Sequence, residues 1–135
     1  MSDLFKWNPA FSINVPEMDR EHQVLIQLMN SLNELWTKGA ARSELAKALT
    51  DLVSYTRRHF ADEEAYMLRI GYPDLTKHRM IHERLLSQLD DFAGEFRHSG
   101  KLSDDLFVFL KTWLKAHICG IDTKYAAHEQ RAKAG

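Results

Sequence analysis

Four stretches of this chain repeat an apolar residue at every third or fourth position, and short polar connections separate them. This period is typical of amphipathic α-helices, whose apolar residues form one stripe that faces a core. The expected helices run from just after Pro16 to Gly39, from the N-cap Ser43 to about Ile70, from about Leu75 to about Arg97, and from the N-cap Ser103 to about Ala127. We therefore predict an all-α fold, an up-down-up-down antiparallel four-helix bundle.

Two short terminal segments flank this bundle. Residues 1–15 mix apolar side chains with asparagine and proline, which argue against a helix. We expect an N-terminal arm that packs on the domain as a strand-like cover through Trp7, Phe11, Ile13 and Val15. A short tail over about 128–135 is small and charged, and we expect it to fray. Nothing in the sequence separates a second unit, so we expect one domain over residues 1–135.

Composition narrows the class of protein. A formal net charge of -1 gives no support for nucleic acid binding. No apolar run is long enough to span a membrane, and the N-terminus lacks the basic start and apolar block of a secretory signal. A single cysteine, Cys119, excludes an intramolecular disulfide and fits a reducing compartment. We expect a cytoplasmic protein, and the charged helix exteriors favour a monomer.

Histidine is the unusual component, because five of the 7 histidines fall on the apolar stripes. His59 and Glu63 are four residues apart, a spacing that places both side chains on one helix face. In an antiparallel bundle, alternate helices begin and end at the same level. Counting about 1.5 Å per residue from that level places the polar stripe residues within a band of roughly 12 Å. These residues are His22, His59, Glu63, His78, His82, His117 and Asp122.

One spacing in this set does not suit a regular helix. His117 and Asp122 are five residues apart, so on an α-helix their side chains would diverge by about 140°. A local π-turn brings positions five apart into register, and such turns are frequent at functional sites. Gly120 lies between the two residues and lowers the cost of an irregular backbone. We therefore expect a π-turn here; with a regular helix, Asp122 would face solvent.

The polar set suits two metal ions. Buried without partners, these side chains would cost several kcal/mol in desolvation, and they are too many for one tetrahedral zinc ion. Imidazole with carboxylate favours iron, manganese, zinc or copper over calcium or magnesium. If both carboxylates and one oxygen atom bridge two octahedral ions, a single coordination position stays open. Neutral imidazoles favour ferrous iron, unlike the carboxylate-rich sites of di-iron enzymes in bundle folds. Reversible dioxygen binding, with no net change of charge in the apolar pocket, is therefore a reasonable function.

Four sequence segments resemble the hemerythrin family, and in particular its bacterial members: DREH at 19–22, HFADEEAYM at 59–67, HxxxH at 78–82, and WLKAHICGID with Tyr125 at 113–125. The resemblance covers nearly the whole chain. It implies a dioxygen carrier with two irons (Fe2+/Fe3+), an oxo or hydroxo bridge and dioxygen as ligand. By that resemblance, His78, His82 and His117 hold the saturated iron and His22 and His59 hold the iron with the open position. Glu63 and Asp122 would bridge the two.

Residues around this set carry weaker expectations. Leu114 and Ile118 flank His117 and would form the apolar wall of a dioxygen pocket, Trp113 would pack nearby, and Tyr125 would donate a hydrogen bond to a carboxylate; ordinary core packing is the alternative for all four. Cys119 is not a ligand in the family. His98 and His128 are expected to be solvated.

Several functions stay open at this point. Dioxygen storage, transport or delivery is the first, and the oxygen-consuming recipient protein is unknown. An oxygen or redox sensor is the second. A di-iron enzyme acting on peroxide or nitric oxide is the third, and iron or zinc handling is the fourth. We expect no enzyme.

Overall fold

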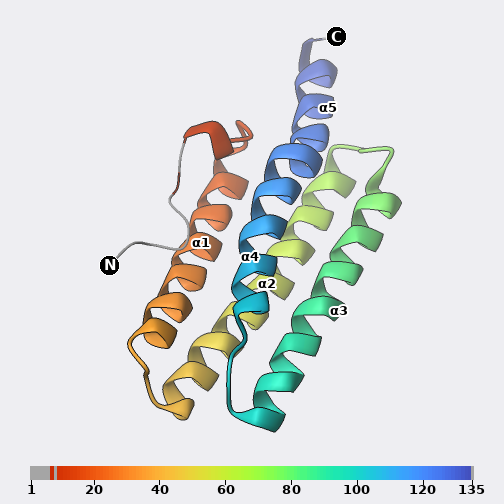
Figure 1. Ribbon diagram of the computed structural model, residues 1–135. Coiled ribbons are helices and arrows are strands. Elements are labelled where there is room, and N and C mark those ends of the chain that lie inside the picture. The colour runs from red at the N-terminus through yellow and green to blue at the C-terminus, as the bar shows by residue number, and fades with distance from the viewer. Residues whose placement is uncertain (1–6, 8, 135) are drawn as a thin grey trace.

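Four long helical rods, joined end to end by short connections, run alternately up and down in the computed structural model, which describes residues 7 and 9–134 (Figure 1). This arrangement confirms the predicted up-down-up-down antiparallel bundle. The elements are the 3-10 turn η1 (Pro9–Phe11), the helices α1 (Pro16–Thr37), α2 (Arg42–Arg69), α3 (Leu75–Ser99) and α4 (Asp104–His117), the π-helical segment η2 (Ile118–Asp122) and the helix α5 (Thr123–Ala134).

The helix ends follow local signals with one exception. α1 begins at Pro16, where a missing amide proton costs nothing. α3 ends at Gly100, which takes a φ of 74°. A side chain there would also lie 2.9 Å from the guanidinium of Arg42, which donates to the Arg97 carbonyl. The predicted cap at Ser43 is wrong. α2 starts one residue earlier, at Arg42, because the carbonyl of Ala41 already accepts the amides of Glu44 and Leu45.

The four apolar stripes face one another and form the core. Leu32, Leu52 and Leu110 have no exposed surface. The starts of α1 and α3 lie at the same end of the bundle as the end of α2 and the segment η2 (Figure 1). At that end the stripes carry the histidines and carboxylates in place of leucine. The fold therefore brings the polar residues of four helices to one level.

The N-terminal arm packs on the bundle but is not strand-like. Its described part contains the 3-10 turn η1, which begins at Pro9, so the strand-like form is a wrong prediction for these residues. Ile13 and Val15 are buried as expected, and the rings of Trp7 and Phe11 are half-buried, 6.0 Å apart. The carboxylate of Asp19 accepts hydrogen bonds from the Ser12 hydroxyl and the Ile13 amide and so ties the arm to α1. Residues 1–6 and 8 of the expected arm lie outside the described residues.

The fourth rod consists of α4, η2 and α5 in continuous succession (Figure 1). The π-helical segment over Ile118–Asp122 confirms the predicted π-turn. Helix α5 continues to Ala134, so the backbone is helical past residue 128, where we expected a tail. Among the described residues, no helix is both long and apolar enough to cross a membrane.

Candidate metal centre

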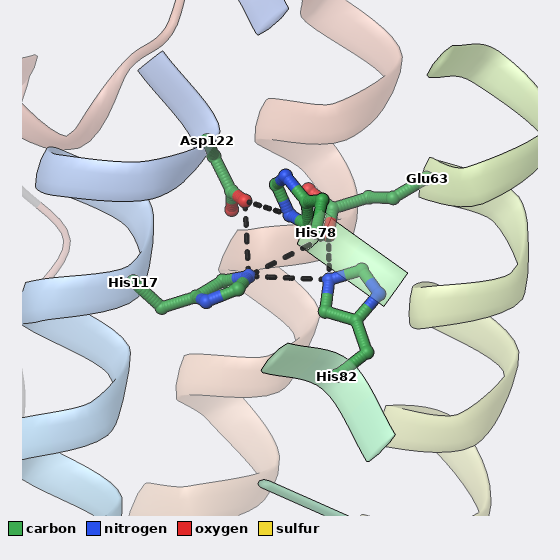
Figure 2. Close-up of side chains that lie close together, drawn as sticks. All are labelled: Glu63, His78, His82, His117 and Asp122. Atoms are coloured by element: carbon green, nitrogen blue, oxygen red, sulfur yellow. Dashed lines mark hydrogen bonds and ion pairs between the residues drawn. The ribbon is translucent and has the colours of Figure 1, made fainter. Parts of the chain in front are cut away.

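Seven side chains of the polar set meet inside the bundle, each at most 5% exposed. They come from all four rods. Figure 2 shows five of them turned toward one another, from α2, from α3, from the end of α4 and from the π-helical segment. The structure thus brings together every residue that the sequence placed in the set: His22, His59, Glu63, His78, His82, His117 and Asp122.

The larger of two groups combines three histidines with both carboxylates. The Nε2 atoms of His78 and His117 lie 3.1 and 3.0 Å from Oδ1 of Asp122. Nε2 of His82 lies 3.1 Å from Oε1 of Glu63 and 3.2 Å from Nε2 of His117. One atom from each of the five residues falls within 4.8 Å of the others, so together they could hold one metal ion (Figure 2).

The smaller group combines His22 and His59 with Glu63. Nε2 of His59 lies 3.5 Å from Oε1 of Glu63, and Nε2 of His22 lies 3.5 Å from Oε2 of the same carboxylate. Nε2 of His22 is also 3.2 Å from Oδ2 of Asp122, whose other oxygen faces the larger group. Both carboxylates therefore lie between two sets of imidazoles, as bridging ligands would.

Several atoms of this cluster have no hydrogen-bond partner. They are buried oxygens and nitrogens: Nδ1 and Nε2 of His22, Oε1 of Glu63, Nε2 of His78, and Oδ1 and Oδ2 of Asp122. An unsatisfied buried polar atom costs about 1–3 kcal/mol, and more where the group is charged. Cations satisfy such atoms directly, and imidazole with carboxylate is a donor set that suits iron. The residues present therefore fit a two-metal site.

The π-turn aligns the last two members of the set. It adds one residue to the turn between His117 and Asp122, so that their side chains meet at 3.0 Å although they are five positions apart. On a regular helix these side chains would point about 140° apart. The backbone irregularity thus brings the second carboxylate, that of Asp122, between the two groups of imidazoles.

Two carboxylates outside the set hold the outer nitrogens of two histidines, and the sequence analysis missed both. Oε1 of Glu21 lies 2.7 Å from Nδ1 of His59, and Oε2 of Glu64 lies 2.9 Å from Nδ1 of His82. A carboxylate on one ring nitrogen fixes the ring and leaves the other nitrogen free for a metal. The signal in the sequence was their position: each directly adjoins a member of the set, His22 or Glu63.

Aromatic and apolar side chains enclose the cluster. The ring of Phe60 stacks on His82 at 3.8 Å, a contact the sequence analysis did not foresee. The hydroxyl of Tyr125 donates to Oε2 of Glu63 at 2.7 Å, as predicted. Beside His22, His59 and Asp122 lies a small recess lined by apolar residues that include Leu25, Trp113, Leu114 and Ile118. The recess touches both imidazoles of the smaller group and also His117 of the larger one.

The remaining polar residues lie outside the cluster. His98 is exposed in the last turn of α3, as expected. His128 is only half-exposed and packs edge-on against Tyr72, with ring centroids 5.6 Å apart, so its predicted full solvation is wrong. Cys119 lies within the π-helical segment, between His117 and Asp122.

Charges within the cluster shift its pKa values. Burial alone would lower the pKa of His22, but the close carboxylates of Asp122 and Glu63 outweigh it and raise that pKa to about 10. The pKa of His117 is raised in the same way. Burial would raise the pKa values of Glu63 and Asp122, but the facing histidines hold both below their usual range. Burial and both carboxylate charges raise the pKa of Tyr125, which keeps it a hydrogen-bond donor.

These shifts predict how the stability of the metal-free protein depends on pH. Because its pKa is raised, His22 stabilises the folded protein below pH 6.5, and this stability is lost as the pH rises toward about 10. Because their pKa values are lowered, Glu63 and Asp122 stabilise the folded protein at pH values above the usual pKa range of carboxyl groups. This stability is lost in acid. Chelator-treated protein should therefore melt at a higher temperature at about pH 6 than at about pH 9.

Circular dichroism melts at the two pH values would check this prediction. Metal-loaded protein is the control: because metal ions displace protons from their ligands, acidification should weaken metal binding there. A metal-free protein that is more stable at the higher pH would contradict the prediction.

The family model for the hemerythrin HHE cation binding domain matches residues 14–128. A bacteriohemerythrin of Methylococcus capsulatus is 33% identical over 90% of this chain and 94% of its own. A myohemerythrin of Riftia pachyptila is 34% identical over 90% of each chain. A wild-type hemerythrin crystal structure superposes with a TM-score of 0.84 at 32% identity, covering 92% of this chain and 96% of that one.

Proposed function

This chain belongs to the hemerythrin family, and from that premise we propose that it binds dioxygen reversibly at a non-heme di-iron centre. His78, His82 and His117 would hold one iron, His22 and His59 the other, and Glu63 and Asp122 would bridge them. The observation that carries the proposal is the division of the cluster into two groups that share buried carboxylates. Storage, transport or delivery of dioxygen would follow from such binding.

The donor set supports binding rather than oxidation chemistry. Iron in such a site supplies the electrons that dioxygen takes up on binding and returns on release. Five imidazoles and two carboxylates place little negative charge around the metals, which favours the ferrous state. Carboxylate-rich di-iron sites in bundles contain four glutamates and two histidines. We therefore propose a binding protein rather than an enzyme, acting as a monomer in the cytoplasm.

The apolar recess supports the same function. Leu114 and Ile118, each 1% exposed, line it beside His22 and His59, and we propose that they form the wall of the dioxygen pocket. Such a wall excludes water from the open position and so slows oxidation of the iron. The hydroxyl of Tyr125 donates a hydrogen bond to Glu63 and so holds this shared carboxylate in place.

An anaerobic optical spectrum of the reduced, iron-loaded protein tests the proposal. The spectrum is repeated after dioxygen is admitted and again after it is removed. A visible charge-transfer band that appears with dioxygen and fades on its removal would support a reversible carrier. Irreversible conversion to a ferric form with no stable adduct would favour a sensor or an enzyme acting on peroxide or nitric oxide. Loose, exchangeable metal would favour metal handling.

Leu114→Ala is expected to shorten the lifetime of the oxygenated form several-fold, because a smaller side chain opens the recess to water. Decay of the charge-transfer band in air measures this lifetime. Leu110→Ala is the matched control: Leu110 is also fully buried on α4 but does not line the recess. Both variants lose roughly 2–5 kcal/mol of stability. Equal decay rates in the two would contradict the assigned wall.

A further inference from the structure

Two of the histidines in the cluster have a carboxylate on their outer nitrogen, and the surroundings of these two carboxylates differ. We propose that Glu21 is a positioning residue whose negative charge strengthens His59 as a ligand, whereas Arg79 offsets the equivalent charge of Glu64 behind His82. The two metals would then differ in how strongly their oxidised state is stabilised. This inference rests on the proposed function and assigns the difference to named side chains.

The geometry of the two contacts is closely matched. Nδ1 of His59 lies 2.7 Å from Oε1 of Glu21, and Nδ1 of His82 lies 2.9 Å from Oε2 of Glu64. The side chains of the two glutamates are 22% and 21% exposed, so solvent screens their charges to a similar degree. Both histidines direct Nε2 toward Glu63. Distance and exposure therefore cannot distinguish the two pairs.

The helix geometry explains why both contacts exist. Consecutive residues on an α-helix point about 100° apart. On α1, His22 faces the interior while Glu21 faces the neighbouring helix α2 and reaches His59. On α2, Glu63 faces the interior while Glu64 faces α3 and reaches His82. Each helix thus supplies one inward ligand and one carboxylate that orients a ligand of the next helix.

The charged groups that contact the two glutamates differ between the two sites. The second oxygen of Glu64, Oε1, accepts a hydrogen bond from Nε of Arg79 at 2.9 Å. In the part of the chain that the structure describes, no lysine or arginine forms an ion pair with Glu21; its other partner is the carboxyl group of Asp62. Glu21 therefore meets a second carboxyl group in Asp62, whose own charge Arg58 offsets from further away, whereas Glu64 shares its charge directly with Arg79.

This difference has an electronic consequence. A full negative charge at Nδ1–H makes the imidazole a stronger donor at Nε2, which stabilises a more highly charged metal ion. Because His59 belongs to the smaller group of imidazoles, the effect falls on the metal with the proposed open position. Glu21 would thus strengthen binding of dioxygen, for which each of the two irons would supply one electron. Arg79 would weaken the corresponding effect of Glu64 on the donor strength of His82, which faces the other metal.

The first test replaces the charge and keeps the hydrogen-bond acceptor. Glu21→Gln should speed ferrous iron release into a chelator by about tenfold, the low end for loss of such a partner, and should raise the reduction potential of the ferric protein in a potentiometric titration. The exchangeable, strongly shifted Nδ1–H resonance of one histidine should move in the proton NMR spectrum of the reduced protein. Glu17→Gln is the matched control, since Glu17 lies one turn earlier on α1 and pairs with Arg69 at the surface.

The second test uses the matched pair on the other side. Glu64→Gln should raise the potential less than Glu21→Gln, and its effect should grow in an Arg79→Leu background. Simple addition of the Glu64→Gln and Arg79→Leu effects would overturn the role of Arg79, because independent charges add. A Glu21→Gln protein that matches wild type in potential, iron release and NMR would overturn the role of Glu21. Wild-type protein that fails to load two irons would count against the proposed function instead.

Discussion

Glu63→Ala is expected to abolish binding of both irons, so that the iron content falls from two per chain to nearly none. Glu63 offers a ligand atom to both groups of candidate ligands, and it faces His22, His59 and His82 at 3.1–3.5 Å. Loss of an outer partner alone costs about 10- to 100-fold in metal affinity, so loss of a shared ligand should cost more at each ion. Iron analysis after desalting, together with the spectrum in air, measures the result.

Controls separate this effect from unfolding. Glu44→Ala removes the same charge from an exposed position on α2 and should keep both irons. Glu63→Gln keeps the size of the side chain and an acceptor for the Tyr125 hydroxyl, yet removes the bridging charge, and should lose iron as well. A helical Glu63→Ala protein with two tightly bound irons and an unchanged spectrum would show that the proposed site is wrong.

The fold could be predicted from the sequence because the apolar period is clear in all four helices. The residues of the assigned stripes are buried in the core or packed against it. The polar residues meet at the level of the bundle that the sequence predicted. Local signals were less reliable. Ser43 was mistaken for a cap because serine favours that position, but no side-chain hydrogen bond caps α2, and the backbone starts the helix at Arg42.

The π-turn was predictable for a physical reason. His117 and Asp122 are both too costly to bury without partners, and both can face the interior only if the helix between them holds an extra residue. The arm was harder, because Pro9 suits either an extended chain or the first residue of a 3-10 turn. In the structure the arm forms the 3-10 turn and is held to α1 by the hydrogen bond from the Ile13 amide to Asp19.

The orienting carboxylates could not be assigned from the sequence. Glu21 and Glu64 lie beside the stripes, where glutamate is ordinary on a solvated helix face. Their roles depend on how far apart neighbouring helices lie, and the sequence does not give that distance. Phe60 is similar: its stacking on His82 follows from the rotation of α2 against α3.

His22→Ala is expected to leave one iron per chain and to eliminate the dioxygen-dependent band. The larger group, with three histidines and both carboxylates, does not contain His22 and should keep its metal. The smaller group would retain only His59 and shares of the bridging carboxylates Glu63 and Asp122, too few donors to hold an ion tightly. The proposed open position belongs to the metal that is lost, so iron would remain without dioxygen binding. Iron analysis and the aerobic spectrum together measure this separation.

Two other histidine variants serve as comparisons for His22→Ala. His98→Ala removes an exposed histidine at the end of α3 and should preserve both irons and the band. His78→Ala takes a ligand from the larger group and should lower iron content there instead. If His22→Ala kept two irons and a reversible band, the division of the cluster into two groups would be wrong. If it lost both irons, the shared carboxylates could not hold one metal without the other, and the two positions would have to fill together.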